Sequence, residues 1–192
     1  MTSKIRYATI AAVTAVAMQL TGCTTFNLSP PQATVASTAK MRSANLAPVA
    51  VGAFKVDAGK ADMDKGTSIR GNALGTTGGS FSQYLAETLK VELKSAGLLD
   101  AASPTVVSGT LTNSEVHGDI GTGKARLAAR FVVTRGNMVQ FDREVKVDDT
   151  WESSFIGGIA IPAAAAHYEG LYRKLVVALI DDADFRSAVS KK

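Results

Sequence analysis

The sequence predicts an α+β domain with a four-stranded, mostly antiparallel sheet and two helices packed on one face, in the order strand-helix-strand-strand-strand-helix. Segments 125–133 and 139–147 alternate apolar and polar residues around a short turn, which is typical of a hairpin with one buried face. Segments 80–96 and 162–181 repeat apolar residues at helical spacing. Elements with one apolar side bury it by stacking in two layers, so a single two-layer domain is expected.

The first 22 residues have the order of a secretory signal. Lys4 and Arg6 form a basic start, and residues 8–18 are small or apolar and carry no charge. This apolar run is shorter than the roughly 20 residues that a membrane-spanning helix needs. We therefore expect residues 1–22 to be removed.

Cys23 ends this segment and is the only cysteine in the chain, so it has no internal disulfide partner. The run Leu20, Thr21, Gly22 and Cys23 resembles the lipobox of bacterial lipoproteins. That resemblance implies cleavage before Cys23, acylation of its thiol by chains such as palmitate, and a lipid anchor in the cell envelope. Thr24 stands where Asp would signal retention in the inner membrane of enteric bacteria, which favours the outer membrane, facing the periplasm.

Residues 23–47 are expected to form a flexible tether, because they are rich in small and polar residues and contain Pro30-Pro31. The folded domain is then 48–192. Its first strand is expected over 48–56, followed by a long polar, Gly-rich loop at 60–79 that is either functional or mobile.

Ser80 is placed to cap the first helix, with Gln83 reaching back, and Gly97 suits its left-handed end. The next strand is expected over 105–116, ahead of the hairpin. Arg143 falls on the apolar side of the second hairpin strand, which indicates either a sheet edge or a bulge.

The second helix is expected to have Pro162 in its first turn and to end near Asp181-Asp182, with a short helical turn after it. The small, apolar run 153–166 leaves two interpretations open. It either packs closely on the sheet as a helix start or faces a partner or a membrane.

The charge balance gives little support to nucleic-acid binding. Without Lys4 and Arg6 the chain carries 19 basic and 17 acidic residues. The two histidines, His117 and His167, show no metal-ligand or triad spacing, and the Gly-rich stretch 71–80 lacks the phosphate-loop pattern. We expect no cofactor, no metal and no catalytic residues.

One alternative is an envelope hydrolase or transferase acting on sugar or lipid, built around Asp148, Asp149, Trp151 and Glu152. It requires these side chains to converge, although consecutive strand residues point to opposite faces. A second alternative is a structural lipoprotein without a discrete ligand.

The segment 78–99, a helix leading into a short Ala-Gly turn, resembles the first-helix region of small Gram-negative envelope lipoproteins. Similar layouts occur in YajG-type lipoproteins, in auxiliary lipoproteins of ABC-type transport systems and in the lipoprotein that assists lipopolysaccharide assembly. The resemblance implies a non-catalytic accessory role with an envelope protein as partner. Candidate binding residues are Arg126 and Arg130 on the outer sheet face, and Trp151.

Overall fold

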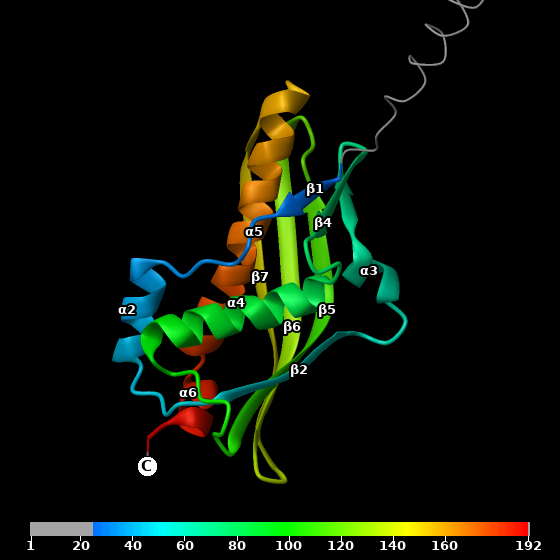
Figure 1. The fold of residues 1–192 in the computed structure, drawn as a ribbon. Helices are drawn as coiled ribbons and strands as arrows, with labels where there is room; N and C mark the ends of the chain where they lie inside the picture. Colours follow the sequence, from blue (N-terminus) through cyan, green and yellow to red (C-terminus); the bar gives the residue numbers. More distant parts are fainter. Residues whose placement is uncertain (1–24, 192) are drawn as a thin grey trace, which may run out of the picture.

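The structure is a computed structural model and describes residues 25–191. Its main feature is a four-stranded sheet in the order β2-β5-β6-β7, formed by Ala50–Val56, Thr105–His117, Gly121–Arg135 and Met138–Ser153. β2 runs parallel to β5, and the other two pairings are antiparallel. The predicted α+β class and this sheet are confirmed, but the fold contains more elements than expected (Figure 1).

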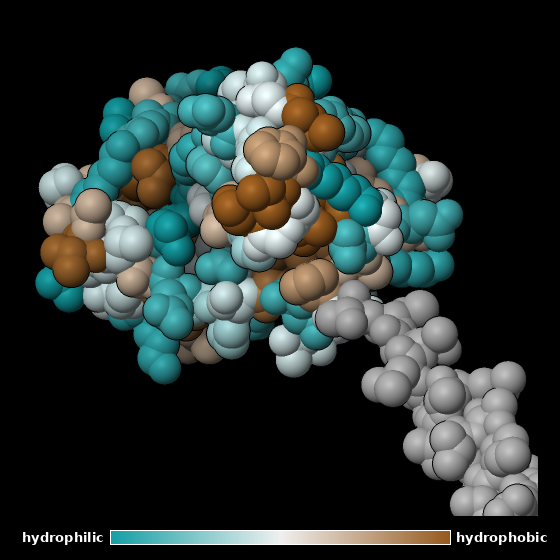
Figure 2. All heavy atoms as spheres, turned by 90° about the horizontal axis from the view of Figure 1, so that it is seen from above, coloured by the Kyte–Doolittle hydropathy of each residue, from teal (hydrophilic) through white to brown (hydrophobic). Residues whose placement is uncertain are grey.

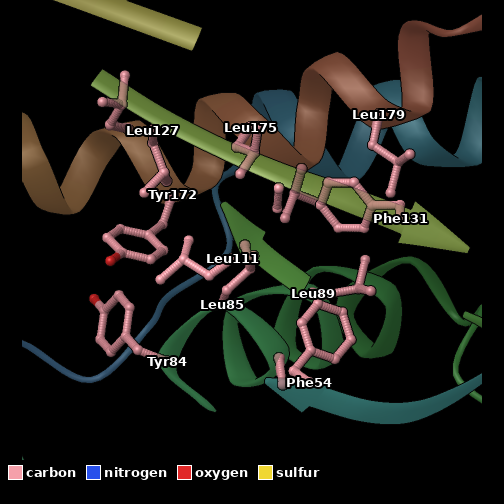
Figure 3. Packing of buried hydrophobic residues seen from close by; sticks show 14 of the residues in the cluster. Phe54, Tyr84, Leu85, Leu89, Leu111, Leu127, Phe131, Tyr172, Leu175 and Leu179 are labelled. Atoms are coloured by element: carbon pink, nitrogen blue, oxygen red, sulfur yellow. The ribbon is translucent and has the colours of Figure 1, made fainter. Parts of the chain in front are cut away.

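Two long helices cover one face of this sheet. α4 (Phe81–Ala96) lies against β2 and β5, and α5 (Gly157–Asp181) lies against β6 and β7. Figure 3 shows part of this core, in which Leu85 and Leu89 of α4 and Leu175 and Leu179 of α5 gather around side chains of the sheet. All four of these leucines are fully buried, as their helical spacing predicted.

The ends of α4 are capped by the expected residues. Ser80 accepts a hydrogen bond from the backbone N–H of Gln83, and Gly97 has a φ of 76°. The side chain of Gln83 does not close a capping box, because it donates instead to the carbonyl of Phe54 on β2. This bond joins the helix to the first strand of the sheet.

Residues 26–46 are not the flexible tether that the sequence suggested. β1 (Phe26–Leu28) and α2 (Val35–Ser43) form here, and α2 packs on α4. Leu28, Met41 and Leu46 are buried in the core. These three large apolar residues are too widely spaced to produce a periodic pattern, so their contribution became visible only in three dimensions.

The segment 60–79 is likewise not a plain loop. It contains α3 (Ala61–Lys65), β3 (Thr67–Ile69) and β4 (Asn72–Thr76), and β4 lies between β1 and β3 in a second, three-stranded sheet. β3 and β4 are joined by the two-residue turn Arg70-Gly71, whose φ angles of 51° and 79° are those of a tight hairpin. Arginine is unusual at such a position, which concealed the hairpin in the sequence.

α5 begins five residues before Pro162, earlier than the sequence indicated, and the short α6 (Ala183–Val189) follows it. Within residues 25–191, no helix is both long enough and apolar enough to cross a membrane.

Candidate binding face of the sheet

The face of the four-stranded sheet opposite the helices carries polar side chains along β5, β6 and β7. Side chains alternate along each strand, so core residues of β6 such as Leu127 and Phe131 alternate with outward ones such as Arg126 and Arg130. We refer to this surface as the outer face. It is the surface on which the sequence placed both arginines.

The two arginines are not free cations, because each lies against an aspartate of the neighbouring strand. Arg126 Nε donates to Asp148 Oδ1 at 2.6 Å, and Arg130 donates to both oxygens of Asp142 at 2.5 and 2.7 Å. The hydrogen bond from Arg130 lowers the pKa of Asp142. Such exposed pairs add little stability but fix the pattern of charge on the surface.

Two open hollows lie on this side of the sheet, one beside each pair. One, of about 400 Å³, is lined by residues that include Glu115, His117 and Lys124 beside the Arg126–Asp148 pair. The other, of about 800 Å³, lies beside the Arg130–Asp142 pair, between β7 and the end of β2. Both are open and polar, which suits contact with a protein surface better than enclosure of a small molecule.

Trp151 lies on the other side of the sheet, against α5. Its indole is buried and stacks on His167 with ring centroids 4.3 Å apart and an angle of 6° between the planes. Gly123 on β6 provides the space, because a methyl group there would overlap the indole. Trp151 is therefore placed as a packing residue and is not available on the outer face.

Asp149 shares this helix-facing side of β7 and joins it to α5. Its carboxylate accepts from His167 Nδ1 at 2.8 Å and from Lys174 Nζ at 2.8 Å. Burial works against ionisation of Asp149, but hydrogen bonds from Lys174 and His167 outweigh it and lower the pKa of the carboxyl.

The convergence that a hydrolase at Asp148, Asp149 and Trp151 would need is not present. Asp148 faces outward to Arg126, whereas Asp149 and Trp151 face α5. Among residues 25–191, no group of three or more His, Cys, Asp or Glu side chains is placed to hold a metal ion. The lipobox residues Leu20, Thr21 and Gly22, together with Cys23, lie outside the described residues.

Three polar residues have structural roles whose partners the sequence did not indicate, although it marked Arg143 as lying near a sheet edge or a bulge, and β7 is an edge strand. Arg143, on the edge strand β7, pairs with Asp182 and Asp184 at the start of α6, which explains its position on the apolar side. Arg70 donates to backbone carbonyls of two distant loops. Glu92 of α4 is completely buried beneath α2.

Glu92 illustrates why the sequence missed these roles. It lies off the apolar stripe of α4, and its carboxyl is enclosed by Ser37 of α2 and Arg173 of α5. Ser37 of α2 donates to its carboxyl at 2.6 Å, and burial raises the pKa of Glu92. A partner 55 positions away leaves no local signal in the sequence.

No family model matches the sequence, and no curated protein is similar to it. Among solved structures, protein XCC0632 from Xanthomonas campestris, which is assigned to the family model DUF330, has a TM-score of 0.57 at 12% identity. The similarity covers 85% of this chain and 96% of that protein.

Two further structures have lower TM-scores. One is a protein from Caulobacter crescentus CB15 that is described as a candidate lipoprotein. It has a TM-score of 0.42 at 10% identity, and the similarity covers 80% of this chain and 94% of that one. The other is protein CT253 from Chlamydia trachomatis, with a TM-score of 0.41 at 12% identity over 70% and 96% of the two chains. The chain therefore shares the overall fold of the Xanthomonas protein, while at this level of identity its function must be inferred from its own residues.

Proposed function

We propose that this chain is a lipid-anchored protein of the bacterial envelope that acts by binding a protein partner, without catalysis, through the outer face of its sheet. In this proposal the acylated Cys23 holds the domain at a membrane, most favourably the outer membrane on its periplasmic side. The partner is a component of an envelope or transport assembly.

The observation that carries the proposal is the uncovered outer face with its ordered charges. Both helices pack on the opposite side, so β5, β6 and β7 present a polar surface on which Arg126 and Arg130 alternate with acidic partners. Opposite charges fixed in a pattern give an interface selectivity and register. Arginine is enriched in protein interfaces relative to the rest of the protein surface.

The same surface offers little to a reaction mechanism. Arg126, Arg130 and their aspartate partners are solvent-accessible and paired with each other, and Trp151 and His167 are used in packing between β7 and α5. General acid–base catalysis needs a positioned, partly desolvated group that faces a substrate. Binding is therefore the function that the geometry supports best.

Site-specific photocrosslinking in intact cells tests this proposal. A photoreactive residue is placed at Thr112 or Lys146 on the outer face, and at Lys94 on the exposed side of α4 as the matched control. We expect the outer-face positions to give an adduct of defined mass with an envelope protein that mass spectrometry identifies.

The control position should give no such adduct. Adducts at Lys94 but not at Thr112 or Lys146 would contradict binding through the outer face and would indicate that the partner binds the helices instead. The complete absence of partner adducts at both faces would favour a structural lipoprotein without a discrete partner.

A further inference from the structure

We propose that one end of this domain is a membrane-contacting surface, with Ile120, Phe155, Ile156 and Ile159 inserting into the interfacial region of the bilayer that holds the anchor. We call these four residues the apical patch. The inference rests on the proposed anchor at Cys23 and adds to it a fixed orientation of the domain on the membrane.

The apical patch gathers half of the large apolar side chains that are exposed among residues 25–191. Eight such side chains are exposed, and four of them belong to the patch. Ile120 lies in the β5–β6 turn, and the other three lie where β7 leads into α5. Figure 2 looks down on this end and shows apolar side chains gathered there. Exposed apolar groups concentrated in this way mark an interaction surface.

The patch is held together by backbone pairing and by one arginine. Gly121 pairs with Ser153, which brings the turn that carries Ile120 beside the connection that carries Phe155. Arg70 donates to the carbonyls of Gly118, Ser154 and Phe155, so it joins both loops. The apolar side chains are therefore presented on a fixed base.

The anchor lies close to this base along the chain. Phe26 of β1 pairs with Leu74 of β4, and β4 follows directly on the turn that contains Arg70. Figure 1 shows the start of β1 at the same end of the molecule as the start of α5. Only two peptide steps separate Thr25 from Cys23, a reach of at most about 7 Å. A lipid on Cys23 would thus hold the bilayer within reach of this end.

The chemistry of the patch favours lipid over a charged partner. Residues 155–166 contain no charged side chain, and the flanking segments add only the acidic Asp119 and Glu152 next to the patch. The guanidinium of Arg70 also lies at its base, but its donors are used on the carbonyls of Gly118, Ser154 and Phe155. These carboxylates do not attract anionic headgroups, so the contact must come from apolar side chains buried at the level of the headgroups. Small apolar residues around Ile159 allow such shallow insertion without a spanning helix.

The inference is tested with the full-length lipidated protein in vesicles of phosphatidylethanolamine and phosphatidylglycerol. An environment-sensitive fluorophore is attached at Ile159→Cys in the patch, or at Val139→Cys near the start of β7 as the matched control. The two native side chains are 58% and 60% exposed. Acylation of Cys23 leaves the introduced cysteine as the only free thiol.

We expect the fluorophore at 159 to shift to shorter emission wavelength on vesicles and to be quenched by lipids that carry a nitroxide on the acyl chain, while the fluorophore at 139 is unaffected. In a Phe155→Ser/Ile156→Ser background, quenching at 159 should fall toward that of the control although the protein stays on the vesicles. Circular dichroism checks that this background is folded.

The other outcomes separate the two proposals. Equal quenching at 159 and 139 on vesicle-bound protein would overturn the membrane contact and leave the anchor intact. Fluorophore attachment to the unmodified sequence, together with failure to bind vesicles, would show a free Cys23 thiol and overturn the anchor and the inference together. A third outcome is a shift of the emission at 159 to shorter wavelength without quenching by the nitroxide lipids, together with a protein mass twice that of the monomer. It would assign the patch to contact with a second copy of the chain and overturn the membrane contact.

Discussion

At the scale of single residues, the contact between β7 and α5 depends on the stacked pair Trp151 and His167 and on the space that Gly123 leaves for it. The indole N–H is buried without an acceptor among the described residues, so close packing must compensate for an unmade hydrogen bond. Neither the stack nor the need for glycine follows from local sequence, because residues 123, 151 and 167 lie on three different elements.

Gly123→Ala is expected to lower the free energy of unfolding by about 1–3 kcal/mol, because the added methyl group overlaps the indole and forces it to move. Chemical denaturation followed by tryptophan fluorescence measures the loss. Gly78→Ala is the control, since no atom lies within 4 Å of a methyl group there. Equal stability of the two variants would show that the indole does not occupy this position.

The lowered pKa of Asp149 predicts that the free energy of unfolding depends on pH. Its pKa in the folded state lies below the ordinary value of 3.8, so the folded state favours the carboxylate. The resulting stabilisation is complete above the pKa of the unfolded chain and is lost as pH falls through the folded-state pKa.

Asp149→Asn should therefore lower the free energy of unfolding by on the order of 1 kcal/mol at pH 7. The difference from the unmodified protein should shrink below about pH 4. Thermal denaturation at several pH values measures both quantities. A difference that is constant from pH 7 to pH 3 would rule out an ionised Asp149 as the cause.

At the scale of elements, the sequence predicted well the parts whose burial repeats locally. The alternation of β6 and β7 and the helical stripes of α4 and α5 located four elements and the buried face of each. α2 and the β3–β4 hairpin escaped because their anchors are single residues, such as Met41 and Ile69, whose partners lie far away in the chain.

The candidate binding face was likewise predicted from the sequence only in part. Period-two alternation placed Arg126 and Arg130 on the outer face, where they lie. It could not show that each pairs with an aspartate of β7, because the cross-strand register depends on the turn at Gly136 and on a bulge next to it. Neither charge nor periodicity indicated which face of the sheet Trp151 occupies. The structure places its side chain against α5.

α2 is expected to be an integral part of the domain. Met41→Ala should lower the free energy of unfolding by roughly 2–5 kcal/mol, because it removes a buried side chain between α2 and the core. Val35→Ala on the same helix changes a side chain that is 90% exposed and should alter stability by less than about 0.5 kcal/mol. If both variants unfold like the unmodified protein in urea, α2 is only loosely attached.

At the scale of the whole molecule, the described residues present two surfaces of different chemistry. The outer face is broad, polar and lined by ion pairs, whereas the apical patch is small and apolar. With the patch on the bilayer, the long strands of the sheet would rise from the membrane and present the outer face sideways to an envelope partner. The two surfaces could therefore be used at the same time.

Loss of the paired charges should weaken partner binding without unfolding the domain. Arg130→Ala removes an exposed pair, whose contribution to stability is typically about 0.2–1 kcal/mol. It is expected to reduce the yield of the photocrosslinked adduct at Lys146 while leaving the thermal midpoint almost unchanged. Lys94→Ala on the helical side is the control, and an undiminished adduct in Arg130→Ala would exclude this pair from the interface.

The central claim is that the domain is held at a membrane by lipid on one thiol. Intact-mass and N-terminal peptide mass spectrometry of the protein purified from its own membranes tests it most directly. The account predicts a mature chain that starts at Cys23 and carries the mass of the acyl groups on that residue. A chain that starts elsewhere, or an unmodified sulfur at position 23, would contradict it.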